Sequence, residues 1–293
     1  MKELLECKLC PHNWKGNRII NEKGRCRAGK KIKIALADLH FFEEPCISGE
    51  NGSGAIFFTG CNMSCIYCQN YKISQNFFGK EIEIEDLADE FLKLQNRGAN
   101  NINLVTGFMY VPHIKEALKI AKEKGLMIPI IYNSSGYENI ETLKMLDGYI
   151  DVYLPDMKYY YNELSKRLSN IDNYFDVAKN AIKEMYRQVG STKVNENGII
   201  EKGLIIRHLV LPNHIQNSKE VLKWIKNNID ENVYISIMAQ YFPSYKAMSF
   251  EDINRKLFKE EYEEIENFVF KLNIKNGYLQ DLENDEEKYV PNF

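Results

Sequence analysis

Short apolar runs alternate with segments of helical periodicity along most of the chain. Six of these runs are rich in Val, Ile and Tyr and alternate poorly between apolar and polar residues, which is typical of strands buried on both faces. The strands predicted in this way cover residues 55–58, 102–105, 128–132, 149–154, 204–211 and 233–238.

Between these runs, apolar residues recur at helical spacing. The predicted helices cover residues 84–92, 112–121, 138–146, 175–185, 221–225 and 262–272, and a shorter segment from Phe250 precedes the last. Gly98 and Gly125 are typical of positions just after a helix, Pro112 suits a first helical turn, and Ser218 suits an N-cap. A loop is expected from Gly190 to Gly203.

Six strand–helix units predict an α/β protein with a parallel sheet and right-handed crossovers. Six units are fewer than the eight of a closed barrel, so periodicity leaves an open doubly wound sheet and a partial barrel as alternatives. In both architectures the functional loops follow the C-terminal ends of the strands.

Composition narrows the class of protein. Of 293 residues, 44% are apolar and 27% are charged, as in ordinary soluble proteins. The net charge of −3 argues against binding nucleic acid mainly by electrostatics. No apolar run reaches the roughly 18 residues of a membrane-spanning helix, and the first residues lack the apolar core of a secretory signal. We therefore expect a cytoplasmic protein with neither nucleic acid nor membrane as a partner.

Cysteine is unevenly distributed, because all seven cysteines lie in the first quarter of the chain. An odd count without a secretory signal argues against a disulfide framework. Clustered thiols of this kind indicate ligands of a metal or an iron–sulfur cluster, or a redox pair. The residues are Cys7, Cys10, Cys26, Cys46, Cys61, Cys65 and Cys68.

The last three cysteines share one loop, GCNMSCIYCQN, which directly follows the first predicted strand. Thiolates are preferred ligands of soft metals and of iron–sulfur clusters. A structural zinc ion would need a fourth ligand close by, whereas three cysteines on a four-iron cluster leave one iron open for a further ligand. Buried thiols without a ligand, or half of a zinc knuckle, are the structural alternatives.

The spacing Cys61-x3-Cys65-x2-Cys68 resembles the CxxxCxφC signature of the radical SAM superfamily, in which φ is aromatic. Further blocks resemble one subgroup, which is related to pyruvate formate-lyase-activating enzyme and carries an additional N-terminal cysteine segment. These blocks are EEPCISGENGSG, NINLVTG, YVPHI, YNSSGYE, DVYLPDMKY, RQVG, IRHLVLPN and IMAQYFP. The resemblance implies a partial (β/α)6 TIM-like barrel over residues 53–275, with an irregular cysteine-containing extension at 1–52 and a C-terminal tail at 276–293.

The resemblance also implies a chemistry. Cys61, Cys65 and Cys68 would hold a [4Fe–4S] cluster whose fourth iron binds S-adenosylmethionine (SAM), and reduced flavodoxin or ferredoxin would supply an electron. The resulting 5′-deoxyadenosyl radical would abstract hydrogen from a glycine of a partner that resembles a glycyl-radical enzyme. No catalytic residue is implied beyond the cluster and its ligands. Radical modification of a small molecule or a peptide is an alternative, and a non-catalytic iron–sulfur electron carrier is another.

Contacts to SAM are implied at the ends of successive strands, at Tyr67, Thr106, Asn133, Ser134, Asp156, Lys158 and Arg207. Tyr67 would lie beside the adenine, although core packing alone would also explain it. Thr106 stands where related enzymes have a Gly-Gly-Glu stretch. Asn133 and Ser134 align with a polar pair that contacts the ligand or a monovalent cation. The end of the sixth strand, at Gln240 and Tyr241, is expected near the adenine.

Charged residues on the fourth and fifth strands carry the clearest physical argument. Asp156 and Lys158 match the DxK pattern of activating enzymes, with a helix N-cap as the alternative for Asp156. Arg207 interrupts an apolar strand, where a positive charge is costly unless it is paired. The resemblance implies that its partner is the SAM carboxylate. His208 would point the opposite way and is expected to be structural.

The four N-terminal cysteines, Cys7, Cys10, Cys26 and Cys46, form a second candidate site for zinc or for another cluster. The subgroup pattern CxxCPxxC has a third cysteine where this chain has Trp14. A four-ligand site would therefore need Cys46 or His12 to complete it, and unliganded buried thiols are the alternative. His40, Glu43 and Glu44 are expected at the mouth of the substrate site, with no assigned chemistry.

Overall fold

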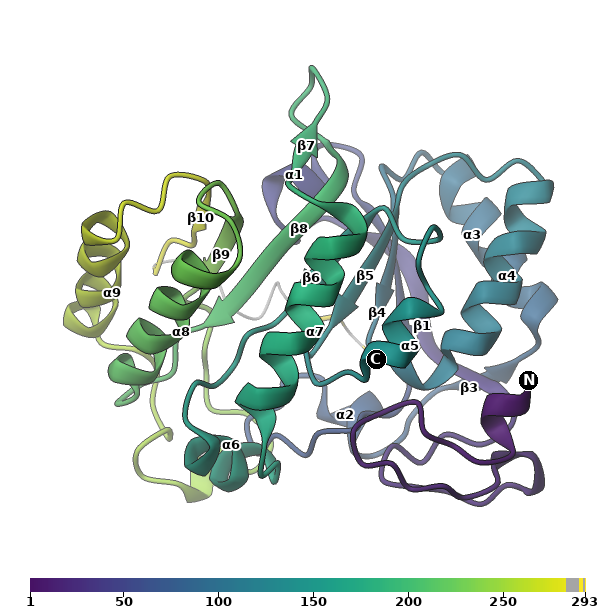
Figure 1. Ribbon diagram of the computed structural model, residues 1–293, viewed down its shortest axis with the longest axis horizontal. Helices are drawn as coiled ribbons and strands as arrows, with labels where there is room; N and C mark the ends of the chain where they lie inside the picture. The colour runs from purple at the N-terminus through teal and green to yellow at the C-terminus, as the bar shows by residue number, and fades with distance from the viewer. Residues whose placement is uncertain (283–289, 292) are drawn as a thin grey trace.

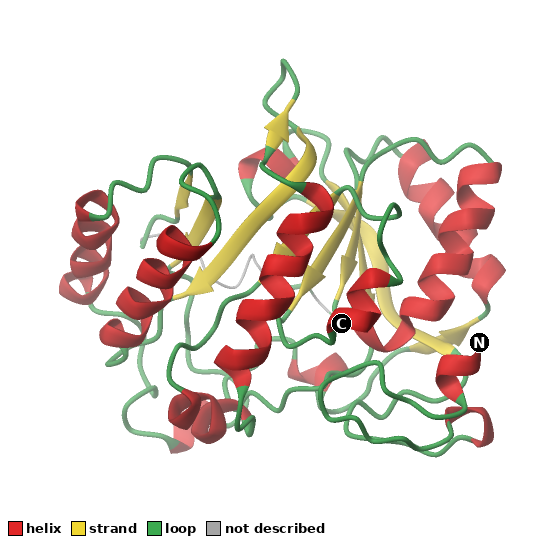
Figure 2. Cartoon of the chain, viewed as in Figure 1, coloured by secondary structure: helices red, strands yellow, loops and turns green. Residues whose placement is uncertain are grey.

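The structure, a computed structural model, describes residues 1–282, 290–291 and 293. Its strands form one curved sheet, and the larger helices lie along one side of it (Figures 1 and 2). The strand order is β10-β9-β8-β6-β5-β4-β2-β1-β3, and β7 pairs with β8 outside this path. The strands are β1 Ile32–His40, β2 Ser53–Phe58, β3 Lys80–Ile82, β4 Ile102–Val105, β5 Ile130–Ser134, β6 Val152–Pro155, β7 Lys193–Val194, β8 Ile200–Leu209, β9 Tyr234–Met238 and β10 Gly277–Leu279.

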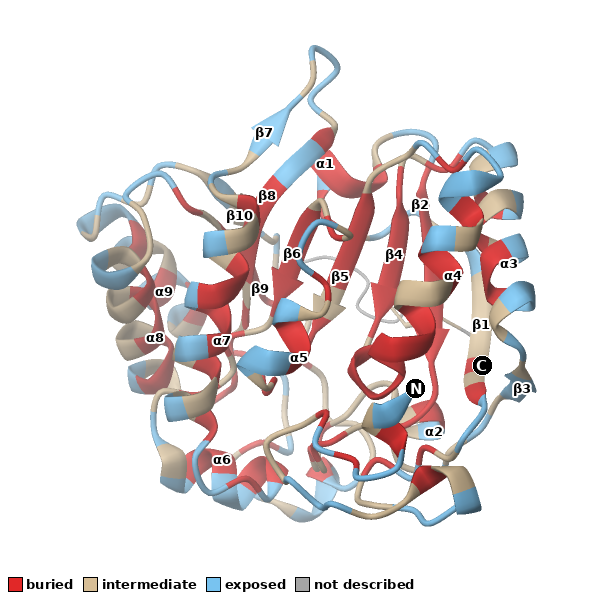
Figure 3. Cartoon of the chain, turned by 45° about the vertical axis from the view of Figure 1, so that its right-hand side comes forward, coloured by how far each residue is buried: buried red, intermediate tan, exposed pale blue. Residues whose placement is uncertain are grey.

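Six strands, β2, β4, β5, β6, β8 and β9, pair in parallel along the centre of the sheet. Every residue of β2, β4 and β6 is buried, which explains why these strands read as apolar runs without alternation (Figure 3). The predicted α/β class and partial barrel are therefore confirmed.

The register brings the predicted strand ends to one edge. Val105 of β4 pairs with Asn133 of β5, and Ser134 of β5 pairs with Pro155 of β6. Asp156, the next residue, forms a bridge with Arg207 of β8. Polar residues that lie far apart in the sequence thus meet at the carboxyl ends of the strands, as expected for this class of fold.

The helices are α1 Pro45–Ser48, α2 Tyr71–Ser74, α3 Ile84–Asn96, α4 Val111–Glu123, α5 Ile140–Lys144, α6 Asn162–Ser169, α7 Tyr174–Val189, α8 Ile215–Asn228 and α9 Lys259–Lys271. All six predicted long helices exist. Pro112 lies in the first turn of α4, and Gly98 and Gly125 adopt positive φ angles just after α3 and α4, as predicted.

Three sequence predictions were wrong in detail, and one helix was not predicted. Ser218 lies inside α8, which begins three residues earlier, and its side chain bonds to His208 instead of capping the helix. The segment from Phe250 forms turns. Helix α6 was not predicted, because its eight residues carry only a short apolar stripe. The expected loop from Gly190 to Gly203 contains β7 and the start of β8 as a hairpin.

The N-terminal extension is less irregular than expected. Residues Ile32–His40 form β1, which pairs antiparallel with β2 and extends the sheet. Arg18 is fully buried and joins the extension to the barrel, because its guanidinium donates to the carbonyl oxygens of Gly29, at 2.8 and 3.0 Å, and of Met109, at 2.6 Å. Figure 1 shows the part of the extension that precedes β1 along the edge where the central strands end.

Of the predicted tail at 276–293, residues 277–279 form β10, which pairs in parallel with β9. The acidic end of the tail falls mostly on residues 283–289 and 292, which lie outside the described residues. Phe293 packs against Phe57 with ring centroids 5.4 Å apart. Of the helices described, none combines the length and apolar character that crossing a bilayer requires.

The buried Arg18 gives a prediction about stability. Replacing Arg18 with Met keeps most of the side-chain volume but leaves the carbonyls of Gly29 and Met109 without their donor. We expect the free energy of unfolding, measured by denaturant titration, to fall by about 2–3 kcal/mol. Arg97→Met is the control, because Arg97 forms an exposed ion pair with Asp38 and should cost less than about 1 kcal/mol. Equal losses in the two variants would contradict the role of Arg18.

Candidate functional site

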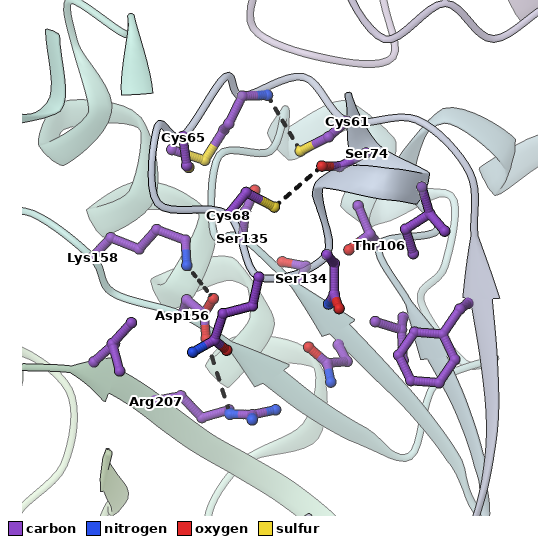
Figure 4. A pocket seen from close by; sticks show the side chains of 18 of the residues that line it. Cys61, Cys65, Cys68, Ser74, Thr106, Ser134, Ser135, Asp156, Lys158 and Arg207 are labelled. Atoms are coloured by element: carbon purple, nitrogen blue, oxygen red, sulfur yellow. Dashed lines mark hydrogen bonds and ion pairs between the residues drawn. The ribbon is translucent and has the colours of Figure 1, made fainter. Parts of the chain in front are cut away.

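A cavity of about 210 Å³ opens at the carboxyl ends of the central strands. Its wall combines the cysteine loop after β2 with the residues that end β4, β5, β6 and β8 (Figure 4). The cavity is lined by every residue that the sequence predicts for the cluster and SAM sites, namely Cys61, Cys65, Tyr67, Cys68, Thr106, Asn133, Ser134, Asp156, Lys158 and Arg207.

The cysteine loop is held in place by its backbone. Gly60 starts the loop with φ of +104°, and a Cβ there would lie 2.4 Å from the carbonyl oxygen of Cys26, so only glycine fits. The amides of Ser64 and Ile66 donate to the last carbonyls of α6, those of Ser169 and Leu168, at 3.1 and 2.9 Å. Helix α6 thus uses two C-terminal carbonyls, which cannot be paired within the helix, to fix the loop.

Each cysteine sulfur of the loop has a hydrogen-bonding group beside it. The Met63 amide donates to Cys61 Sγ at 3.4 Å, the Ser169 hydroxyl lies 2.9 Å from Cys65 Sγ, and the Ser74 hydroxyl lies 3.1 Å from Cys68 Sγ. Burial raises the pKa of all three thiols, that of Cys68 to about 11. Without a metal the thiols are therefore protonated at neutral pH, and metal binding would have to displace the protons.

The ends of β4 and β5 present uncharged polar groups to the cavity. Thr106 has a φ angle of +57°, which is unusual for a β-branched residue, and its amide donates to the Asn133 carbonyl at 2.8 Å. Strained backbone of this kind concentrates at ligand sites. Asn133 and the buried Ser134 line the cavity beside it, and the Ser134 hydroxyl accepts a bond from the Gly136 amide at 3.1 Å.

Asp156 and Lys158 form an ion pair inside the cavity, with 2.5 Å between Nζ and Oδ2. Burial alone would lower the pKa of Lys158, but Asp156 and the nearby Cys65 raise it on balance, so the ammonium group stays charged. Asp156 is not a helix N-cap, because its carboxylate contacts Lys158 and, at 4.0 Å, Arg207. A monovalent cation bound to Asp156 would have to share this carboxylate with the Lys158 and Arg207 side chains.

Arg207 points into the cavity and has carboxylate partners within the chain. Its guanidinium lies 3.1 Å from Glu43 and 3.3 Å from Glu44, both of which precede α1. The three side chains are only 13%, 6% and 5% exposed. Burial raises the pKa of Glu44, and its Oε2 has no hydrogen-bond partner among the residues that the structure describes. A SAM carboxylate would therefore join an existing ion-pair group.

Neighbouring aromatic and polar residues fill out the site. The Tyr67 hydroxyl lies 2.6 Å from that of Tyr159, and its ring packs edge-on against Tyr241. Tyr241 does not line the cavity, but Gln240 does. His208 points away from Arg207 as predicted: it is fully buried, 2.6 Å from the Met157 carbonyl and 2.8 Å from the Ser218 hydroxyl.

The N-terminal cysteines do not form one four-cysteine group. Cys7, Cys10 and Cys26 all precede β1, whereas Cys46 follows it in α1 and belongs to a buried apolar cluster with Ile131 and Ile200. The predicted group of four cysteines is divided because β1 lies between Cys26 and Cys46 in the sequence and carries the chain to the opposite end of the sheet. His12 bonds through Nε2 to the Asn62 carbonyl, at 2.7 Å. Within the described ranges, no three His, Cys, Asp or Glu side chains surround a single-ion position.

Sequence reasoning missed the partners of the functional side chains. Glu43 and Glu44 were expected only at the substrate mouth, yet they neutralise Arg207. Ser74 and Ser169, which approach the cysteine sulfurs, carried no sequence signal because serine is common in loops and at helix ends. An unpaired arginine inside an apolar strand was the one signal that called for a carboxylate elsewhere in the chain.

The environment of His208 predicts a dependence of stability on pH. Burial lowers the pKa of His208 to about 4, compared with about 6.5 in an unfolded chain. The unfolded state therefore binds the proton first, and stability from this residue is lost as pH falls from about 6.5 to about 4, by up to about 1.4 kcal/mol per pH unit. We expect His208→Gln to be less stable at pH 7 but to lose less stability over this window in denaturant titrations. Parallel pH profiles would contradict the assignment.

Comparison with known sequences gives a family. The sequence profile of the Radical SAM superfamily matches residues 55–201. The uncharacterized protein MJ0674 of Methanocaldococcus jannaschii is 36% identical over 276 residues, which cover 92% of this chain and 75% of that protein. A pyruvate formate-lyase-activating enzyme of Clostridium pasteurianum is 23% identical over 62% of this chain and 71% of its own length.

Comparison with solved structures supports the fold. Streptococcus suis SuiB bound to its precursor peptide SuiA has a TM-score of 0.51 and 13% identity, over 76% of this chain and 47% of SuiB. The [FeFe]-hydrogenase maturase HydG has a TM-score of 0.51 and 14% identity, over 73% of this chain and 47% of HydG. The chain thus matches about half the length of these structures. Taken with the profile match and the relative from Methanocaldococcus, the cysteine loop and the partial barrel make this chain a member of the radical SAM superfamily.

Proposed function

We propose that this chain is an enzyme that cleaves SAM reductively at a [4Fe–4S] cluster held by Cys61, Cys65 and Cys68, and that it abstracts a hydrogen atom from a glycine of a partner protein. SAM and such a cluster are what membership of the radical SAM superfamily implies. The observation that carries the proposal is the cavity in which all three thiols meet polar groups from four successive strands.

The donor set fits the cluster. Three soft sulfur ligands come from one loop, each beside a hydrogen-bonding group that would stabilise a thiolate. In a four-iron cluster each cysteine binds a different iron, so the sulfurs need not converge on one point as they would around a single ion. When bound, the cluster supplies the electron that cleaves the sulfonium of SAM.

The chain's own residues would then bind and orient SAM. Arg207 and Lys158 are half-buried cations of the cavity and would hold the methionyl carboxylate, while Asp156 contacts both of them. Thr106, Asn133 and Ser134 would contact the methionyl amino group or the ribose through their polar side chains and backbone. Tyr67 would stack beside the adenine. Burial of this wall limits the access of water, which protects a reactive radical from side reactions.

A glycine of a partner protein is the proposed source of the hydrogen atom. Support comes from the relative named as a pyruvate formate-lyase-activating enzyme and from the matching blocks along the strands. Reduced flavodoxin or ferredoxin would deliver the electron, and free thiols suit the reducing cytoplasm. An electron carrier alone would have no need of the half-buried Arg207 and Lys158 in the same cavity as the cysteine loop.

Replacing any one of Cys61, Cys65 and Cys68 with Ala should abolish the cluster, because no further cysteine lines the cavity within the part of the chain that the structure describes. After anaerobic reconstitution, iron content and the absorbance of the cluster measure this loss, and 5′-deoxyadenosine formed from SAM and dithionite should fall at least 100-fold. Cys46→Ala is the control. Because Cys46 lies outside the cavity, this variant should keep both the cluster and the formation of 5′-deoxyadenosine. A variant that keeps a full cluster without one of the three thiols would refute the ligand assignment.

The substrate class needs its own experiment. The reconstituted protein is mixed with SAM, a reductant and each glycyl-radical enzyme encoded in the same genome, and electron paramagnetic resonance is recorded. We expect a glycyl radical signal with one of them and none when Cys65→Ala replaces the wild type. Formation of 5′-deoxyadenosine without a glycyl signal from any candidate would reject the activase proposal and favour a small molecule or a peptide as substrate.

A further inference from the structure

A chain of buried hydroxyl groups leads to the sulfur of Cys65. Ser169 Oγ lies 2.9 Å from Cys65 Sγ, Tyr159 Oη lies 2.7 Å from Ser169 Oγ, and Tyr67 Oη lies 2.6 Å from Tyr159 Oη. Ser169 and Tyr159 are fully buried, and Tyr67 is 6% exposed. The chain therefore runs through the protein interior from the cavity wall to a cysteine of the loop.

Once Cys65 is a metal ligand, every hydrogen bond in this series of hydroxyl groups can have only one donor and one acceptor. A metal-bound thiolate has no proton and can only accept, so Ser169 must donate to it. The Ser169 oxygen then accepts from Tyr159, and the Tyr159 oxygen accepts from Tyr67. Because all three O–H groups point toward the sulfur, each bond polarises the next and strengthens the last one.

A second hydroxyl approaches another sulfur of the same loop. Ser74 Oγ lies 3.1 Å from Cys68 Sγ, as Figure 4 shows. The side-chain amide of Gln75 donates to Ser74 Oγ at 3.3 Å, which leaves the serine proton free to bond to Cys68. The third sulfur, that of Cys61, accepts only the longer bond from the Met63 amide, at 3.4 Å.

We propose that Ser169, supported by Tyr159 and Tyr67, together with Ser74, raises the reduction potential of the cluster. An added electron increases the negative charge on the cysteine sulfurs, and hydroxyl donors stabilise that charge more in the reduced state than in the oxidised one. The effect is large because the bonds lie in a buried, weakly polar environment. Ser169 and Ser74 act through the sulfurs of Cys65 and Cys68, and Tyr159 acts through Ser169. Tyr67, which the proposed function also places beside the adenine, acts through Tyr159. The inference rests on the proposed assignment of the cluster to the cysteine loop.

The test is an anaerobic redox titration of the reconstituted protein, monitored by electron paramagnetic resonance in the absence of SAM and of any substrate. Ser169→Ala should shift the one-electron reduction equilibrium about tenfold toward the oxidised cluster, which corresponds to a potential lower by about 59 mV. Ser74→Ala should shift it in the same direction. Tyr159→Phe, which keeps the serine but removes its donor, should give a smaller shift of the same sign.

Ser165→Ala is the matched control. Ser165 is fully buried in the same helix, α6, but its hydroxyl bonds to the carbonyls of Asn162 and Ile171 and not to sulfur. Its replacement removes the same atom from the same helix and should leave the potential unchanged. A shift in Ser165→Ala equal to that in Ser169→Ala would assign the effect to loosening of α6 and overturn the proposal.

Wild-type potentials in Ser169→Ala and Tyr159→Phe, each carrying a full cluster, would also overturn it. If Ser169→Ala fails to take up the cluster, Tyr159→Phe decides the question, because it leaves every group that touches sulfur in place. A wild-type protein that binds no cluster would reject the ligand assignment and this inference with it. Failure to form a glycyl radical would leave the titration unaffected, so the two proposals fail separately.

Discussion

Arg207 lies near the carboxyl end of β8 with its side chain only 13% exposed, and the site depends on keeping its charge neutralised. A lone cation there would be strongly destabilising, and a pair broken by removing one partner is among the costlier changes in a protein. Glu43 and Glu44 provide the compensation from a segment that precedes the first barrel strand, while Asp156 links Arg207 to Lys158. The ion-pair group therefore ties the chain before α1 to strands β6 and β8, and it sets which positive groups a ligand carboxylate can reach.

How much the sequence predicts depends on whether a feature is local. The apolar runs that became β2 and β4 lie where expected because strands buried on both faces leave an unmistakable pattern. The cysteine loop was found because its three cysteines lie within eight residues. The pairing of Arg207 with Glu43 was not found, because it joins residues 164 positions apart. Cys46 was grouped with the other cysteines by proximity in sequence, and only the course of β1 separates them.

The N-terminal extension is part of the site rather than an appendage. Arg18 bonds to the Met109 carbonyl next to β4, Arg25 bonds to the Ser64 hydroxyl and to the Asn170 carbonyl, and His12 bonds to the Asn62 carbonyl. Two of these contacts reach residues of the cysteine loop itself. Trp14, which replaces a cysteine of the subgroup pattern, lies over Gly16 and Gly24, where a Cβ would clash with its indole. Packing of the Trp14 indole against these two glycines thus helps to order this part of the extension.

The two amide bonds that join the cysteine loop to the end of α6 have a consequence for maturation. A loop that is ordered only by its metal must lose conformational entropy when the metal arrives, and that loss weakens binding. Here the amides of Ser64 and Ile66 bond to the carbonyls of Ser169 and Leu168, so contacts within the protein help to order the loop. Part of the ordering cost then falls on folding of the chain, and a cluster bound as proposed would have less of that cost to meet.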